Sequence, residues 1–522
     1  MGSWNLYFLL KFFLYLRGVV QPIWGVNLLF IIALALPVNR RWIRVIRNLI
    51  ALVVAIPLLY YESNMPPFAH AIEQINGIAG FTPSYLLELL GRFLPTQLIL
   101  IALAAMLAYY VLNRWIRVSA IVLMIFLAIP AWNLMSVELG RLGTPGAAQA
   151  ANTGGPRQGT LLQASNYDSI LKQFRQSEAQ RLVTFDHVDP EADARFDIIV
   201  LHICSLSWDD LDAAKAKNHP LLSHFDYLFT NFSSAASYSG PAAIRLLRAD
   251  CGQESHADLY KAAAPNCNIF SALAQAGYTP QVVLNHDGRF DDFVGDVTRN
   301  IGIPNMQPFP NDSATVTIKA FDGSPVRDDY SILSKWWQAR EKIPGPVALY
   351  YDSITMHDGN HLIGTSSSMS STESYPTRVN TLMNEVDQFA NLVAASNRKA
   401  VLIFIPEHGA ALRSEPGQIA GLRDIPTPRI VNVPVGVKLI GFPGNRPPMQ
   451  VINTPTSYLA LAQLLANLVA NSPFKPVSPP LTQYVADLPH TEMIGENEDT
   501  ITIHTPTGYM MRTSGGDWVA GK

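Results

Sequence analysis

The sequence predicts an α-helical transmembrane domain followed by an α/β domain with a central, mostly parallel sheet flanked by helices. Charged residues make up only 15 % of the 522 residues, and the first 136 residues are nearly free of acids. This deficit indicates contact with lipid. From about residue 166, apolar runs typical of buried strands alternate with helical patterns, which indicates βαβ units. We therefore expect a transmembrane domain over residues 1–136, a flexible linker over 137–165 and the α/β domain over 166–522.

Four segments of the first domain are apolar and long enough to cross a bilayer. They cover residues 19–38, 48–61, 97–113 and 118–136. The second of them is long enough only if it also includes the residues from Trp42 to Arg47. Residues 4–16 are shorter and contain Lys11, so they form either a fifth span or an interfacial helix. No small-residue cleavage site follows them, which argues against a signal peptide. Residues 82–94 have the amphipathic pattern of a helix on the outer membrane surface.

The basic residues of the first domain predict its orientation. Arginines cluster at 40–47 and at 114–117, between apolar segments. The positive-inside rule places both clusters in the cytoplasm, so the linker and the α/β domain are expected in the periplasm of a Gram-negative cell. The net charge of −3, without a useful basic run in the C-terminal part, argues against a nucleic-acid partner.

The chain has three cysteines, so at least one thiol lacks a partner within the chain. Cys251 and Cys267 lie in a loop-rich stretch. They either close a short disulfide, which stabilises the fold by roughly 3 kcal/mol in an oxidising compartment, or are two unrelated thiols. Cys204 ends a hydrophobic strand and needs a separate explanation.

The second domain contains five continuous apolar runs that predict strands buried on both faces. The first run begins at Phe196, and the other four cover residues 281–286, 346–354, 400–408 and 433–441. Helical patterns lie between the runs at 240–249, 269–277 and 381–396. Residues 500–518 have the pattern of a terminal hairpin. Because parallel strands end at one edge of a sheet, polar residues after these runs are expected to gather there.

The residues at this edge include types that bind zinc. Cys204 follows the first run, and Glu407-His408-Gly409 follows the run that begins at residue 400. A thiolate, a carboxylate and an imidazole are ligands that zinc prefers, and a glycine permits a turn. The alternatives are a Glu and a His exposed on a loop, and a buried core thiol.

His357 and His361 follow the run at 346–354 and lie four residues apart, with Asp358 and Asn360 between them. They are candidates for a second metal pair or for phosphate-binding and acid–base groups. The alternative is that both histidines are exposed loop residues.

Ser239 lies in the segment SYSGPAAIRLLRA, where Gly240-Pro241 precedes an apolar periodic run. This pattern predicts a helix that starts at or near Ser239. A helix N-terminus favours anions, so a serine there is well placed to attack phosphorus. The alternative is that Ser239 only caps the helix, which is a common role for serine.

Taken together, SYSGPA, CSLSW, HDGNH and PEHG resemble motifs of the cellulose phosphoethanolamine transferases of bacterial cellulose secretion systems, the BcsG family of the alkaline phosphatase superfamily. The similarity runs nearly end to end and includes FDGSPV, GLRDIP and the terminal GGDW. It separates the chain from lipid A phosphoethanolamine transferases, whose metal sites usually use threonine and aspartates.

The resemblance implies one catalytic Zn²⁺ held by Cys204, Ser239, Glu407 and His408, with Ser239 as the covalent nucleophile. It also implies that His357 lies near the transferred group and that Arg423 and Tyr238 line the substrate pocket. We add His361 as a candidate for substrate binding. The resemblance further implies a disulfide between Cys251 and Cys267.

The implied reaction transfers phosphoethanolamine from phosphatidylethanolamine to glucosyl 6-hydroxyls of secreted cellulose, with possible contact to the cellulose synthase complex. One alternative is a phosphatase or phosphodiesterase of the same superfamily. A sulfatase is disfavoured, because Ser239 is not followed by the Pro-x-Arg pattern of that class. The other alternative is a scaffold without catalytic activity, although the nucleophile and its candidate ligands are all present.

Overall fold

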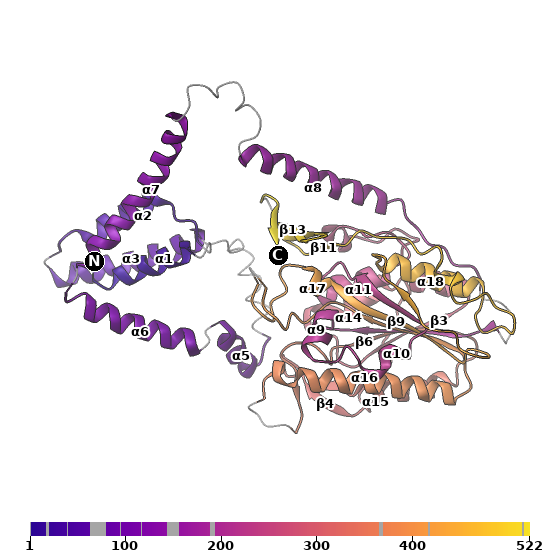
Figure 1. Ribbon diagram of the computed structural model, residues 1–522. Helices are drawn as coiled ribbons and strands as arrows, with labels where there is room; N and C mark the ends of the chain where they lie inside the picture. Colours follow the sequence, from indigo (N-terminus) through magenta and orange to yellow (C-terminus); the bar gives the residue numbers. More distant parts are fainter. Residues whose placement is uncertain are drawn as a thin grey trace. The chain divides into compact units, whose positions relative to one another are not determined.

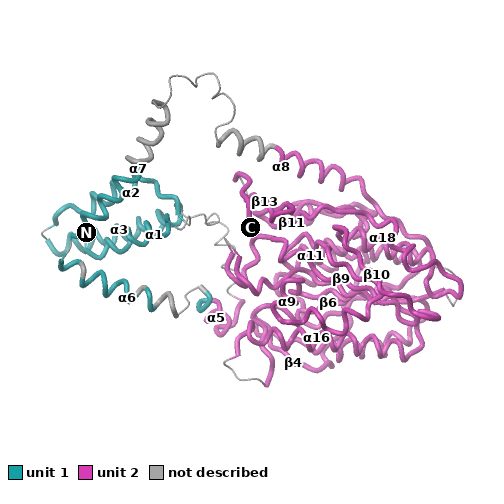
Figure 2. Tube along the Cα trace, viewed as in Figure 1, with its two compact units in different colours: residues 1–79, 90–159 teal, residues 80–89, 160–522 magenta. Residues whose placement is uncertain are grey.

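A computed structural model of the chain forms two compact units, residues 1–79 with 90–159, and residues 80–89 with 160–522 (Figure 1, Figure 2). The structure describes residues 2–16, 20–38, 40–62, 80–93, 96–115, 117–142, 156–187, 194–364, 369–415, 418–513 and 516–521. The second unit contains the predicted α/β domain. It also takes in residues 80–89, which the sequence prediction had assigned to the membrane domain.

The first unit is helical. Its helices are α1 (Trp4–Leu16), α2 (Trp24–Ala35), α3 (Arg41–Glu62), α6 (Thr96–Leu112) and α7 (Val118–Leu142). Among the described residues, α3 is the one helix long and apolar enough to cross a membrane, whereas α1, α2 and the first part of α7 are shorter apolar helices. The expectation of four or five spans therefore stays a prediction.

Lys11, which interrupts the first apolar segment, is buried in this helical unit. Its ammonium forms an ion pair with Glu62 and donates a hydrogen bond of 2.6 Å to the Asn27 side chain. A buried charge is tolerated in an apolar helix when it is paired in this way. The lysine therefore fits a packed helix within the unit.

The predicted linker differs from the structure at both of its ends. Helix α7 extends to Leu142, and α8 (Pro156–Glu178) begins inside the expected linker, so that 137–142 and 156–165 are helical. The small and polar residues here have no apolar periodicity, and for that reason the sequence did not predict these helices. Residues 143–155 lie outside the described residues.

The core of the second unit is a seven-stranded sheet with the order β10-β2-β9-β8-β1-β6-β3. Its strands are β1 (Asp197–Ile203), β2 (Tyr227–Ser233), β3 (Thr279–Leu284), β6 (Val347–Ser353), β8 (Ala400–Pro406), β9 (Asn432–Ile440) and β10 (Gln450–Ile452). All five predicted strands are present. The sequence missed β2, whose two central residues are only half-buried, and the three-residue β10.

The sheet is mixed, because β9 runs antiparallel to both of its neighbours, β2 and β8. Strands β3, β6, β1 and β8 are mutually parallel, as the sequence predicted. The sequence predicted a mostly parallel sheet but did not identify the run at 433–441 as its antiparallel strand. A strand buried on both faces has the same apolar pattern in either direction, so the sequence did not show its polarity.

Helices cover both faces of this sheet (Figure 1). Helices α11 (Ser239–Leu247), α13 (Ile269–Ala276), α14 (Phe293–Asn300) and α18 (Tyr458–Ala470) pack on one face. Helices α9 (Trp208–Ala213), α10 (Pro220–Ser223), α15 (Asp329–Arg340) and α16 (Ser371–Ala395) pack on the other. Alternate residues of β1 enter the two cores, so that Ile198 and Val200 face α11 while Ile199 and Leu201 face α16.

Two smaller sheets complete the unit. One consists of β4 (Val316–Lys319), β5 (Pro325–Arg327) and β7 (His361–Leu362), and the other of β11 (Ile494–Glu496), β12 (Thr500–Thr505), β13 (Gly508–Thr513) and β14 (Val519–Gly521). The predicted terminal hairpin is the pair β12–β13. The predicted disulfide between Cys251 and Cys267 is present, with 5.4 Å between the two Cα atoms, and Cys204 is a buried free thiol.

Candidate metal and nucleophile site

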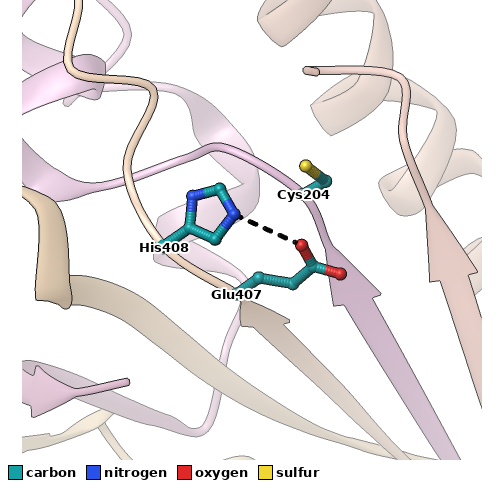
Figure 3. A group of neighbouring side chains, drawn as sticks. All are labelled: Cys204, Glu407 and His408. Atoms are coloured by element: carbon teal, nitrogen blue, oxygen red, sulfur yellow. Dashed lines mark ion pairs between the residues drawn. The ribbon is translucent and has the colours of Figure 1, made fainter. Parts of the chain in front are cut away.

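The ends of two neighbouring strands bring Cys204, Glu407 and His408 together. Strands β1 and β8 are parallel and pair Ile203 with Pro406, so the next residues emerge at the same edge of the sheet. The three side chains are fully buried, and one ligand atom of each lies within 4.8 Å of the others (Figure 3). The sequence had placed these residues at one sheet edge, and the structure shows that their side chains also point toward one another.

The turn after Glu407 orients the imidazole of His408. Nδ1 lies 2.9 Å from the Gly409 carbonyl oxygen, which can only accept a hydrogen bond. Nδ1 therefore carries the proton, and Nε2 keeps its lone pair toward Glu407, whose carboxylate is 3.6 Å away. Such an arrangement is typical of a histidine that binds a metal through Nε2.

Gly409 is required here because of a close approach. A Cβ at this position would lie 2.8 Å from the Ser207 hydroxyl oxygen and 3.0 Å from the Asp210 carboxylate. Asp210 caps α9 together with Ser207 and also accepts a hydrogen bond of 2.7 Å from the Ala410 amide. The start of α9 thus fixes the turn that carries Glu407 and His408.

Ser239 is the first residue of α11, and its hydroxyl lies beside the cluster. Oγ is 3.4 Å from the Cys204 sulfur and 3.5 Å from His408 Nε2. The N-cap residue is Tyr238, and no side chain caps this helix. The alternative of a purely capping serine therefore does not hold, and the hydroxyl is left available for chemistry at a helix N-terminus.

The three buried side chains suit a divalent cation. Neither carboxylate oxygen of Glu407 has a hydrogen-bond partner in the described part of the chain, which is costly for a buried group. Burial and the neighbouring Asp352 raise the pKa of Glu407 well above its usual range, and burial raises the pKa of the Cys204 thiol. A bound cation would favour the thiolate and the carboxylate, so binding would release protons. Cys, Glu and His together are a donor set that fits Zn²⁺.

A second row of polar residues supports Glu407 from within the sheet. His202 Nδ1 lies 3.6 Å from a Glu407 oxygen and 3.1 Å from the Tyr350 hydroxyl. Asp352 lies 3.1 Å from His286 Nε2. Although burial raises the pKa of Asp352, hydrogen bonds with His202 and His286 bring it below its usual range. This row was not predicted from the sequence, although a histidine inside the apolar run of β1 was a signal.

His357 lies on the loop that follows β6. Its Nδ1 is 2.6 Å from the Asp358 carbonyl oxygen, and its ring stacks on Phe321 with 4.4 Å between ring centroids. Arg378, fully buried on α16, donates hydrogen bonds to the carbonyl oxygens of Thr355 and His357. Because Nδ1 donates to a carbonyl, Nε2 carries the lone pair of the neutral ring.

Burial and the nearby Arg423 guanidinium lower the pKa of His357 to about 4. The ring is therefore neutral at physiological pH and able to accept a proton. Substitution of His357 by Asn is expected to lower the transfer rate by about 10²-fold, which is typical for loss of a general base.

This pKa gives an expected pH dependence. A depressed pKa means that base function is present above it and is lost as the pH falls through about 4. The ratio of wild-type to His357→Asn rates should therefore stay constant from about pH 7.5 down to about pH 5.5 and shrink below about pH 4.5. The pH–rate profiles of both proteins give this ratio. A ratio that already falls near the ordinary histidine pKa of about 6.5 would contradict the assignment of His357 as the base.

Arg423 and Tyr238 lie together near the nucleophile. The guanidinium carbon is 5.5 Å from the centre of the Tyr238 ring, and Nη1 donates a hydrogen bond of 2.9 Å to the Ser205 hydroxyl. The Tyr238 hydroxyl donates to Asp424 at 2.6 Å. Asn497, which the sequence analysis did not single out, fixes the loop by donating to the Arg423 carbonyl oxygen at 3.1 Å.

His361 lies away from the cluster of Cys204, Glu407 and His408. It is half-buried in β7, with Nε2 3.7 Å from a Glu88 oxygen. Among the described residues, the groups close enough to share one ion do not include His357 or His361. The possibility of a second metal pair at these histidines therefore finds no support, and a role of His361 in substrate binding stays a prediction.

Both parts of the chain match known protein families. Residues 4–131 match the family described as "Cellulose biosynthesis protein BcsG N-terminal domain", and residues 151–518 match "Cellulose biosynthesis protein BcsG C-terminal domain". The Cellulose biosynthesis protein BcsG of Escherichia coli K12 is 36 % identical over 99 % of this chain and 96 % of its own length. The protein of the same name from Salmonella typhimurium LT2 is equally similar.

Solved structures are similar at lower identity. A protein of the alkaline phosphatase superfamily from Vibrio parahaemolyticus is 12 % identical, covering 67 % of this chain and 87 % of its own, with a TM-score of 0.47. The lipooligosaccharide phosphoethanolamine transferase A from Neisseria meningitidis is 13 % identical, covering 89 % and 95 %, with a TM-score of 0.40.

The fold and the site define the chain as an α/β protein with a serine at a helix N-terminus and candidate metal ligands at its strand ends. The family matches and the full-length identity specify it further. The chain belongs to the cellulose biosynthesis protein BcsG family.

Proposed function

We propose that this protein transfers phosphoethanolamine from phosphatidylethanolamine to glucosyl 6-hydroxyls of cellulose, through a covalent phosphoethanolamine–Ser239 intermediate. The observation that carries the proposal is the position of the Ser239 hydroxyl, which does not cap α11. Its oxygen lies 3.4 Å from the Cys204 sulfur and 3.5 Å from His408 Nε2. Family membership supports cellulose as the acceptor, and the resemblance in sequence supports phosphoethanolamine as the transferred group.

One Zn²⁺ is proposed at this site, held by Cys204, Glu407, His408 and the Ser239 hydroxyl. The oxygens of Glu407, which have no hydrogen-bond partner among the described residues, and the lone pair on Nε2 of His408 support this choice of ligands. When bound, the ion would lower the pKa of the serine hydroxyl and stabilise negative charge on the phosphoryl oxygens.

In the first half-reaction, Ser239 Oγ forms a bond to phosphorus while the bond from phosphorus to the glycerol oxygen breaks. The serine loses one proton and the departing diacylglycerol gains one, so no external acid is needed. His357 is the proposed carrier, because its neutral Nε2 takes up a proton and then acts as general acid. The N–H groups at the start of α11 stabilise the charged oxygens.

In the second half-reaction, a 6-hydroxyl oxygen of cellulose attacks phosphorus and the bond to Ser239 breaks. His357 accepts the proton of the hydroxyl, and the same proton restores the serine. Two in-line displacements predict net retention of configuration at phosphorus and ping-pong kinetics. Arg423 is the proposed partner of the phosphoryl oxygens, and Tyr238, whose ring packs against its guanidinium, lines the same pocket.

The reaction also accounts for the expected location. We propose a multi-pass protein of the inner membrane with its catalytic unit in the periplasm, where lipid donor and secreted cellulose are both available. The apolar α3 and the helical first unit support a membrane anchor. Contact with the cellulose synthase complex is proposed on the basis of the shared pathway alone.

The proposal is tested by supplying purified full-length protein with phosphatidylethanolamine labelled in its ethanolamine group and with cello-oligosaccharides. We expect label on the oligosaccharide 6-hydroxyls and free diacylglycerol in equal amounts. Release of free phosphoethanolamine at the same rate with and without acceptor would instead identify a phosphodiesterase. No turnover of the lipid by metal-loaded protein would favour the scaffold role.

A further inference from the structure

Residues 80–89 belong to the α/β unit, although they lie in the sequence between α3 and α6. They include the first part of α5 (Pro83–Phe93) and pack on the small sheet that contains β4 and β5. The Thr82 amide donates a hydrogen bond of 2.9 Å to the Phe321 carbonyl oxygen. Tyr85 is only 6 % exposed and packs against Phe321 and Val326. This segment is therefore a fixed part of the unit.

The segment contacts the ring on which His357 stacks. Phe81 meets Phe321 edge-on, with 5.5 Å between ring centroids, and Tyr85 lies 6.3 Å from the same ring. Phe321 in turn stacks on the His357 imidazole, with 4.4 Å between ring centroids. The position of the histidine ring thus depends on an aromatic stack that residues 80–89 complete.

The segment also binds a side chain of the histidine loop. The Tyr85 hydroxyl donates a hydrogen bond of 3.0 Å to the Asp358 carboxylate, and the carbonyl oxygen of Asp358 accepts from His357 Nδ1. Gly359 follows with a φ of +77°, and a Cβ there would lie 2.7 Å from the Tyr85 ring. The loop is thus shaped to admit Tyr85 at close range.

The far end of the loop is held by the next turn of the same helix. A Glu88 carboxylate oxygen lies 3.7 Å from His361 Nε2 and accepts a hydrogen bond from the Ser371 amide at 3.3 Å. Arg378 holds the opposite side of the loop through the carbonyl oxygens of Thr355 and His357. The loop is therefore fixed between α16 and residues 80–89.

We propose that residues 80–89 are a positioning segment for the acid–base histidine, with Tyr85 as its central residue. The inference rests on the proposed role of His357. The segment lies in the sequence between α3 and α6, so a part of the chain outside residues 166–522 supplies a wall of the catalytic unit.

The test uses the full-length chain and two donors that differ in their need for a general acid. Phosphatidylethanolamine leaves as a basic alkoxide that must be protonated, whereas the nitrophenolate of p-nitrophenyl phosphoethanolamine leaves without a proton. Tyr85→Phe is expected to slow formation of the Ser239 adduct roughly 10-fold with the lipid and by a smaller factor, about threefold, with the nitrophenyl donor, for which His357 only takes up the Ser239 proton.

Leu90→Ala is the matched control, because Leu90 is on the same helix but outside residues 80–89 and is 53 % exposed. It should leave the rates with both donors unchanged. Equal slowing of both donors by Tyr85→Phe would indicate a general folding defect and overturn the inference, as would an equal effect of Leu90→Ala. If Ser239→Ala abolishes both reactions while Tyr85→Phe changes neither, the proposed function stands and the positioning role fails. If Ser239→Ala abolishes neither, the proposed function itself fails.

Discussion

Ser239→Ala is expected to lower phosphoethanolamine transfer by about 10⁴-fold or more, because loss of a nucleophile removes the covalent route entirely. The hydroxyl is the only part of the residue that changes, and it has no capping role in α11. Helix stability should therefore be nearly unchanged. The measurement is the steady-state rate of label transfer from phosphatidylethanolamine to cello-oligosaccharide.

Ser223→Ala is the control for this change, since Ser223 is an exposed serine on the short helix α10 and should keep the wild-type rate. Thermal unfolding of both variants establishes that the fold is intact. A Ser239→Ala protein that retains more than about a tenth of the wild-type rate would show that phosphorus is attacked directly by the acceptor.

Glu407→Gln is expected to weaken Zn²⁺ binding by at least about 100-fold. This loss is larger than that expected for a residue that only hydrogen-bonds to a metal ligand, because Glu407 would bind the ion directly. The substitution keeps the shape of the side chain but removes the negative charge. It also leaves an amide in a fully buried site where the carboxylate has no hydrogen-bond partner among the described residues. Metal content after dialysis and competition with a chelator measure the affinity.

Glu341→Gln, at an exposed position after α15, is the matched control and should keep one Zn²⁺ per chain. Transfer should fall in parallel with the metal content of Glu407→Gln and recover in part when excess Zn²⁺ is added. Full metal content in this variant would exclude Glu407 as a ligand.

The sequence predicted that Cys204, Glu407 and His408 lie at one edge of the sheet, because this depends on strand order. Cys204 and Glu407 follow apolar runs, and parallel strands necessarily end at one edge, so their meeting followed from pattern alone. The direction of β9 did not follow, because an apolar strand reads the same in both directions. The helical ends of the predicted linker were missed because their sequence lacks apolar periodicity.

The supporting residues of the site are the part that sequence reasoning missed. Arg378 and Asn497 act through hydrogen bonds to backbone carbonyl oxygens, which leave no motif in the sequence. Tyr85 lies more than 270 residues from its partner Asp358, in a segment whose amphipathic pattern predicted a helix on the membrane surface. Only tertiary structure brings such pairs together.

The most direct test of the account is intact-mass analysis of the full-length protein after a short exposure to phosphatidylethanolamine without acceptor. We expect wild-type protein to gain the mass of one phosphoethanolamine group, located by peptide mapping on Ser239 and lost when cello-oligosaccharide is added. The Ser239→Ala protein should gain no mass. An adduct of equal amount on both proteins, or one that persists with the acceptor present, would contradict the account.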